Sequence, residues 1–242
     1  MISVITPTVR PEGLALVAKA LKRQTFKDFE WIIGSRVHPL HIEGLKLGID
    51  YVFVQDPKKK PEEYWSVYKA YNNAIRAAEG NLIISWQDFT YAKPDALQKF
   101  WDHYQEDNKV IVTGVGNKYD NDEWIVQIWQ DPRQRTDQGT YYGCFYNDIE
   151  INFAAFPKEA FYAVGGFDEE WGDKYSSVCG LDVLARLDII GGWDFKIDQT
   201  NETFSLEHGR LHGWEKNLPF AGPWQKRLEE YKSQPVLDFL KR

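Results

Sequence analysis

Asp88 has the residue type and the position expected of a ligand-binding side chain. The apolar run at 82–84 is typical of a strand buried on both faces, and it ends in the polar residues Gln87 and Asp88. Pro94 and Asp95 indicate that a helix begins soon afterwards, because proline fits the first helical turn and a carboxylate there favours the positive end of the helix dipole. Ligands of open α/β sheets bind beyond the carboxyl ends of the strands. We therefore predict that Asp88 faces a bound ligand.

Strands alternate with helices in the first half of the chain. The expected elements are strands at 2–6, 30–33 and 51–54 and helices around 14–21 and 61–78. Gly80 ends the second of these helices and leads directly into the strand before Asp88. This alternation predicts a doubly wound, mostly parallel sheet with helices on both faces.

The second half of the chain has a different pattern. The expected elements are strands at 110–115, 124–129, 195–197 and 204–206 and helices at 158–164, 181–190 and 223–240. The span 130–147 is polar and rich in Asp, Arg, Gln and Gly, which predicts a long, mobile loop that could cover a site.

Composition limits the class of protein. A chain of 242 residues is long enough for one large α/β domain, which we favour over two small ones. The net charge of −7, with both signs interspersed, argues against a broad basic face for nucleic acid. Two cysteines fit neither a disulfide framework nor a zinc site, and no apolar run approaches the length of about 18 residues that a membrane span needs. A soluble, cytoplasmic protein is expected.

Three blocks of sequence resemble the family 2 glycosyltransferases, which have the GT-A fold of the nucleotide-diphospho-sugar transferase superfamily. The blocks occur in the family's order, and they read ISVITPTVRPEGLALVAKALKRQTFKDFEWIIGS at 2–35, NNAIRAAEGNLIISWQDFTYAKPDAL at 72–97 and NFAAFPKEAFYAVGGFDEEWGDKYSSVCGLDVLARLDIIGG at 152–192. The resemblance implies one GT-A domain over 1–222, with a donor half at 1–109 and an acceptor half at 110–222, followed by a C-terminal helix at 223–242.

The resemblance also implies a reaction. Members of this family move a sugar from a nucleoside diphosphate, most often UDP, to an acceptor hydroxyl, usually with inversion at the anomeric carbon. Such a transfer needs a base for the acceptor proton, neutralisation of the leaving diphosphate, and a firmly held nucleotide. A glycan or glycoconjugate acceptor is the family default.

Site residues follow from the same resemblance. Asp182 corresponds to the second acid of the family's Glu-Asp pair and is the predicted catalytic base; the alternative is a helix N-terminal Asp stabilised by the helix dipole. The predicted nucleotide-sugar ligands are Thr6, Pro7, Thr8, Arg10, Lys69, Asn73, Gln87 and Asp88. For Lys69 and Asn73, a solvated helix face is the competing interpretation.

The metal-binding motif departs from the family pattern. Members usually have two or three acids where this chain has only Asp88, flanked by Gln87 and Phe89. One interpretation is that Asp88 and His208 hold a divalent cation, Mn or Mg, together with the diphosphate. The other is weak or absent metal dependence, with Arg and Lys on the phosphates. The first is favoured here, although His208 could also be an ordinary loop residue.

Loss of the acid cluster supports a second class of function. A non-catalytic nucleotide- or sugar-binding domain of the same fold would need no metal cage. Because one fold can carry several functions, the fold alone does not decide between the two.

Overall fold

The computed structural model describes residues 1–56, 67–174, 179–207 and 221–233, and its centre is one mixed β-sheet. The strand order is β3-β2-β1-β4-β9-β6-β10-β5, with β7 paired to β6 and β8 paired to β10. The strands are β1 Ile2–Thr8, β2 Phe29–Ser35, β3 Val52–Gln55, β4 Leu82–Trp86, β5 Thr90–Ala92, β6 Val110–Tyr119, β7 Gln127–Gln130, β8 Tyr141–Gly143, β9 Phe153–Pro157 and β10 Asp194–Leu206.

The first half of the chain forms the parallel part of this sheet. β1 pairs in parallel with β2 and β4, and β2 pairs in parallel with β3. All seven residues of β1 and all five of β4 are buried, as the predicted two-sided burial of 82–84 requires. The alternating strands and helices predicted for this half are confirmed.

The second half inserts an antiparallel strand that the sequence analysis missed. β9 lies between β4 and β6 and runs antiparallel to both. Its sequence, FAAFP, is short and ends in proline, so it carries no alternation by which to recognise it. The strands predicted at 195–197 and 204–206 are instead one strand, β10, whose pairing with β6 shifts register between Ile197 and Glu202. That irregularity explains why the sequence suggested two strands.

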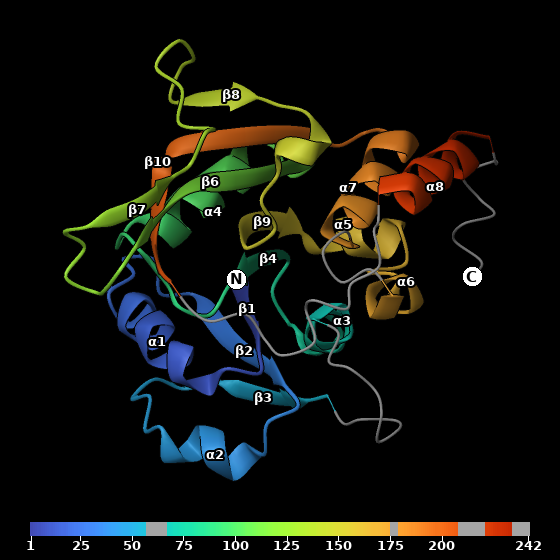
Figure 1. Cartoon of the computed structure of the whole chain (residues 1–242). Helices are drawn as coiled ribbons and strands as arrows, with labels where there is room; N and C mark the ends of the chain where they lie inside the picture. The colour runs from blue at the N-terminus through green and yellow to red at the C-terminus, as the bar shows by residue number, and fades with distance from the viewer. Residues whose placement is uncertain (57–66, 175–178, 208–220, 234–242) are drawn as a thin grey trace.

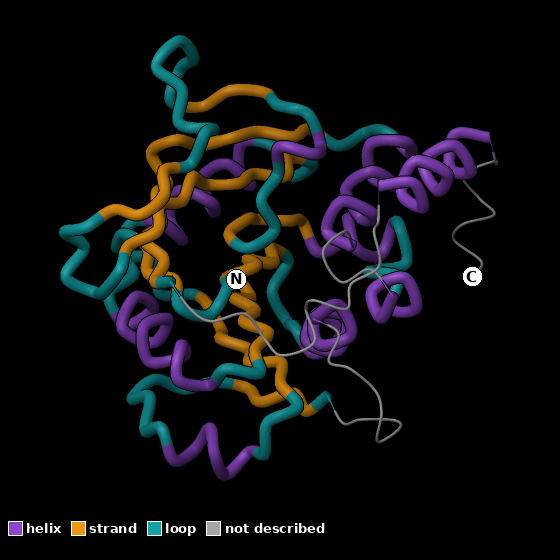
Figure 2. Tube along the Cα trace, viewed as in Figure 1, coloured by secondary structure: helices purple, strands orange, loops and turns teal. Residues whose placement is uncertain are grey.

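Helices cover both faces of the sheet (Figures 1 and 2). They are α1 Leu14–Lys22, α2 Pro39–Gly44, α3 Val67–Ala77, α4 Ala96–Glu106, α5 Lys158–Ala163, α6 Glu169–Lys174, α7 Cys179–Ile190 and α8 Ala221–Ser233, with short 3-10 turns at Pro11–Gly13 and Tyr146–Asp148. One buried cluster joins the sheet to α1, α2 and α4, and the other joins it to α3, α5 and α7. Adjacent strand residues alternate between the two clusters, as Ile83 and Ile84 do, because side chains of a strand point to opposite faces.

The segment 130–147, which its polarity predicted to be one long mobile loop, contains a strand. β8 lies within it and pairs with β10, and the Gln199 side chain bonds the backbone of Arg135 and Gly139. Arg133 pairs with the buried Asp131 at 2.5 Å and donates to the carbonyl of Asp148 at 2.9 Å. These contacts fasten the segment to the sheet, so its polar residues serve internal hydrogen bonds that sequence spacing does not reveal.

Element ends also differ from the sequence prediction. The strand expected at 124–129 begins only at Gln127, because Trp124 has a positive φ of 59° and lies in a turn. The start of the helix predicted from Pro61 and the end of that predicted to residue 240 lie outside the described residues. None of the helices in the described part of the chain is long and apolar enough to cross a membrane.

Candidate functional site

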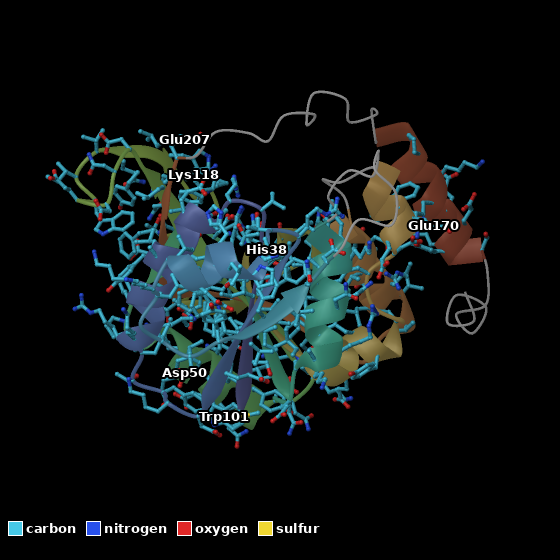
Figure 3. All side chains as sticks on the ribbon, turned by 90° about the horizontal axis from the view of Figure 1, so that it is seen from below. His38, Asp50, Trp101, Lys118, Glu170 and Glu207 are labelled. Atoms are coloured by element: carbon cyan, nitrogen blue, oxygen red, sulfur yellow. The ribbon has the colours of Figure 1, made fainter. Side chains whose placement is uncertain are left out.

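The carboxyl ends of the strands define one side of the molecule. Figure 3 shows Lys118, near the end of β6, and Glu207, directly after β10, toward the upper side, and His38, which follows β2, near the middle. Asp50, which precedes β3, lies on the opposite side. The polar side chains that follow β1, β2, β3 and β4 therefore share one edge of the sheet, which we call the carboxyl edge.

Asp88 lies at this edge immediately after β4, and its side chain is only 2% exposed. Thr8 Oγ1 donates to Asp88 Oδ2 at 2.6 Å, and Arg10 donates from Nη2 to Oδ1 at 2.7 Å and from Nε to Oδ2 at 3.2 Å. The guanidinium thus binds both carboxylate oxygens, the strongest geometry for such a pair. The predicted ligand residues Thr8 and Arg10, which lie 80 and 78 positions from Asp88, meet it in one cluster.

The turn that carries Asp88 is held tightly against the first loop. Phe89 has a positive φ of 57°, a conformation that is strained for a residue with a bulky side chain. Its ring lies 5.4 Å from the Arg10 guanidinium carbon, so the guanidinium contacts both the ring and the Asp88 carboxylate. A Cβ at position 13 would come within 2.8 Å of the Phe89 backbone nitrogen, so only glycine at Gly13 permits this approach.

A second charged cluster, missed by the sequence analysis, follows β2 and β3. Asp56 comes directly after β3 and is fully buried, with Arg36 Nη2 at 3.3 Å and Lys69 Nζ at 3.2 Å from its carboxylate oxygens. Lys69 reaches it because α3 packs close to β2, where a Cβ on Gly34 would lie 3.0 Å from the Ala70 carbonyl. The sequence pattern that pointed to Asp88, a carboxylate directly after a strand, also applies to Asp56.

Backbone contacts join the two clusters. Ser35 Oγ, at the end of β2, donates to the Thr8 carbonyl at 2.5 Å. The Ser35 carbonyl accepts from the Asp56 amide at 2.8 Å. The ends of β1, β2 and β3 are therefore bonded to one another, and the five side chains of the two clusters stand on a rigid base: Arg10, Arg36, Asp56, Lys69 and Asp88.

Some predicted ligands lie elsewhere. Thr6 is fully buried within β1, and its hydroxyl accepts from the Trp31 indole at 3.0 Å, so it faces the core. Pro7 is buried in the same strand. Asn73 accepts from its neighbour Arg76 at 2.7 Å, and Gln87 is half-buried beside Asp88. Thus Thr8, Arg10 and Asp88 meet in one cluster, and Lys69 lies in the second cluster at the same edge.

Asp182 lies at the start of α7, in a network separate from the carboxyl edge. Its carboxylate is fully buried: Arg186 donates to Oδ2 at 2.7 and 3.0 Å, and Arg227 Nε and the Tyr231 hydroxyl donate to Oδ1 at 2.8 and 2.5 Å. Burial, followed by the charge of Asp182, raises the pKa of Tyr231. Both oxygens therefore have strong donors in this arrangement, and the assignment of Asp182 as the base stays a prediction.

The same network anchors α8 and the glycine turn before α6. Arg227 also pairs with Asp168 at 2.6 Å and lies over the Trp171 ring at 4.3 Å. Burial by itself would raise the pKa of Asp168. Hydrogen bonds from the Trp171 amide and from Arg227 outweigh this effect and lower that pKa. Nothing in the local sequence around Arg227 predicts this role, because its partners are 45 and 59 positions away.

The described donors do not fit a divalent-cation cage. Among the residues placed by the structure, no three His, Cys, Asp or Glu side chains are grouped as metal ligands. Mg and Mn need several oxygen ligands in a regular shell, whereas both oxygens of Asp88 accept from Arg10 and Thr8. His208, the second predicted ligand, lies outside the described residues, so the predicted metal site stays a prediction.

Comparison with known proteins supports the fold. Neither a family model nor a curated protein matches the sequence. The solved structure of residues 1–349 of S. aureus TarS in complex with UDP-GlcNAc matches with a TM-score of 0.71 and 12% identity, covering 98% of this chain and 69% of that one. The same TarS fragment in complex with UDP matches with a TM-score of 0.63 and 13% identity, covering 85% of this chain and 60% of that one. The longer TarS structure is covered over only 36% of its length.

The class of fold follows from the sheet and from this likeness. A parallel N-terminal half, an inserted antiparallel strand and helices on both faces make an α/β domain with the GT-A fold. The predicted fold class is therefore confirmed. At 12 to 14% identity the likeness shows the fold alone, and the chemistry has to be argued from the carboxyl edge.

Proposed function

We propose that this chain binds a nucleoside diphosphate sugar, with UDP as the nucleotide, at the carboxyl edge of β1 to β4 and transfers the sugar to an acceptor hydroxyl. The observation that carries the proposal is the pair of clusters at this edge, in which Arg10, Arg36 and Lys69 are fixed by two buried carboxylates. A GT-A fold similar to that of TarS, which was solved with UDP and with UDP-GlcNAc, supports UDP as the nucleotide.

The residues of the edge suit distinct tasks. The guanidinium of Arg10 matches the geometry of phosphate oxygens, and Lys69 adds a point charge. Asp56 is a buried acceptor that orients Arg36 and Lys69. Because the leaving diphosphate gains negative charge during transfer, cations fixed beforehand lower the barrier without reorganising.

Deprotonation of the acceptor needs a base, and Asp182 is the predicted one. If Asp182 is the base, the contacts from Arg227 and Tyr231 must open before its carboxylate can accept a proton. A large shift in α8 would then precede catalysis. Inversion at the anomeric carbon and a glycan acceptor remain part of the proposal on the strength of the sequence resemblance.

The closed Asp182 network favours one competing function, a non-catalytic binding domain for a nucleotide or a sugar. Such a domain would bind UDP at the carboxyl edge and use Asp182 only to hold α8. The two proposals agree on the ligand and differ on turnover.

Calorimetry with UDP and GDP tests the shared step. We expect UDP to bind the wild-type protein, and we expect Asp56→Asn to weaken that binding about tenfold or more, which is about 1.4 kcal/mol, because Arg36 and Lys69 lose their anchor. Asp50→Asn is the matched control, since Asp50 is exposed and lies on the opposite side of the molecule (Figure 3). Absence of UDP binding in the wild type would refute both functions.

Turnover separates the two functions. Wild-type protein incubated with UDP-GlcNAc should release UDP slowly by transfer to water or to an added sugar. UDP binding without any release across a panel of UDP-sugars and hydroxyl acceptors would favour the binding domain.

A further inference from the structure

We infer that the diphosphate is neutralised by Arg10, Arg36 and Lys69 instead of a divalent cation, so that nucleotide binding does not require metal. This inference rests on the proposed function and names the groups that would act on the leaving diphosphate. It is carried by the contacts of Asp88 and by the charge balance of the carboxyl edge.

Asp88 is arranged to hold an arginine. Its two oxygens accept from Nη2 and Nε of Arg10, and Oδ2 accepts a further hydrogen bond from Thr8. The Phe89 ring lies against the same guanidinium, and the Arg10 amide donates to Thr8 Oγ1 at 2.8 Å, which fixes the loop. A cation that took Asp88 as a ligand would have to displace Arg10 from a bidentate contact at a site that is 2% exposed.

The charge balance favours an anion. Among the residues that the structure describes, the two clusters bring three cationic side chains to two carboxylates, which sum to +1. The carboxylates are the more deeply buried members, at 2% for Asp88 and 0% for Asp56, while the side chains of Arg10, Arg36 and Lys69 keep 17%, 12% and 9% exposure. A ligand arriving at this edge therefore meets the cations first.

These cations suit the charge that develops in transfer. The bond between the anomeric carbon and the β-phosphate oxygen breaks, and its electron pair stays on the diphosphate. The acceptor oxygen forms the new bond to that carbon and gives its proton to a base or to solvent. The diphosphate leaves with one more negative charge than it carried in the donor, and a guanidinium can meet that charge bidentately.

The decisive experiment is calorimetric titration of UDP into the full chain in EDTA, in Mg and in Mn, with wild type and three variants. We expect wild-type affinity in EDTA to lie within about threefold of that in Mn, and Arg10→Met to lose about tenfold or more in every buffer, because a charge-assisted contact is removed. Arg23→Met, an exposed arginine at the end of α1, is the matched control and should bind as wild type. Lys69→Met is a second, independent probe at the other cluster and should also lose affinity.

The outcomes are distinguishable. UDP binding that appears only with Mn or Mg, and that survives Arg10→Met, would overturn the inference while leaving the proposed function intact. Absence of UDP binding by the wild type in all three buffers would overturn the proposed function itself. If Arg10→Met unfolds, as its melting curve would show, the Lys69→Met titration and the EDTA comparison on the wild type still decide the question.

Discussion

The carboxyl edge and the α7–α8 junction contain similar groups with similar exposure, and they differ in the elements that they join. At the edge, Asp88 binds Arg10 and Asp56 binds Arg36 and Lys69, with the cations toward the surface. At the junction, Asp182 binds Arg186 and Arg227, and Tyr231 of α8 donates to the same carboxylate. Figure 1 shows α8 packed beside α7 at the right of the molecule, away from α1 and α2.

This difference separates a site from a structural network. Asp88 and Asp56 directly follow strands of the sheet, and ligands of open α/β sheets bind beyond the carboxyl ends of such strands. Asp182 instead joins α7 to α8, and uncovering its buried carboxylate would leave Arg186 and Arg227 without their charge partner. We therefore expect mutations at the edge to change ligand binding and mutations at the junction to change stability.

The largest effect is expected at Asp182. Asp182→Asn removes the buried charge that faces the guanidinium groups of Arg186 and Arg227 and should lower the free energy of unfolding by about 3 kcal/mol. The measurement is urea denaturation followed by circular dichroism. Asp188→Asn, an exposed acid on the same helix, is the control and should stay within about 0.5 kcal/mol of wild type. An Asp182→Asn protein as stable as wild type would contradict the structural role assigned to the α7–α8 junction.

Arg227→Met should have the next largest effect on stability. It removes contacts to Asp182 and Asp168 and the stacking on Trp171, at a cost of about 2 kcal/mol. Hydrogen exchange should show faster opening of α8, while UDP affinity stays unchanged. Lys226→Met, an adjacent residue that is largely exposed, is the matched control. A fall in UDP affinity with Arg227→Met would show that the two regions are coupled.

Gly13→Ala tests the edge through backbone packing. The added methyl group would press on the Phe89 backbone, so the turn that carries Asp88 has to move. We expect UDP affinity to fall and the unfolding free energy to drop by about 1 to 2 kcal/mol, as for an overpacked site. Gly44→Ala is the control, because nothing lies within 4 Å of its Cβ position. Unchanged UDP affinity in Gly13→Ala would argue against this turn as part of the ligand site.

The smallest effect is a pH dependence at the junction. The pKa of Asp168 is lowered in the folded protein, so its pairing contributes stability above the unfolded pKa of about 3.9, and that contribution is lost as pH falls through the lower folded value. Asp168→Asn should therefore flatten the decline in stability below about pH 4. The change should be under about 1 kcal/mol, because Asp168 is one-third exposed and solvent screens its pair. If the stability of wild type and variant declines identically with falling pH, the ion pair of Asp168 does not contribute to stability.

The sequence by itself determined the parallel half of the fold and the position of Asp88. The apolar run of β4 is short and follows a glycine, as is typical of a buried strand, and a polar residue directly after a parallel strand lies at the carboxyl edge. Thr8, Arg10 and Lys69 were predicted from the family resemblance. Asp56, which directly follows β3, could have been found in the same way as Asp88.

Only the tertiary structure decided which polar residues meet. Thr6 and Thr8 are two positions apart in the last part of β1. The Thr6 hydroxyl nevertheless bonds to Trp31 in the core, whereas the Thr8 hydroxyl bonds to Asp88. Asp182 and Asp88 are both acids beside an element end, and it is the docking of α8, through Arg227 and Tyr231, that encloses Asp182. Hydrogen bonds between residues 45 to 80 positions apart depend on how helices and strands pack against one another. The spacing of residues along the chain does not predict that packing.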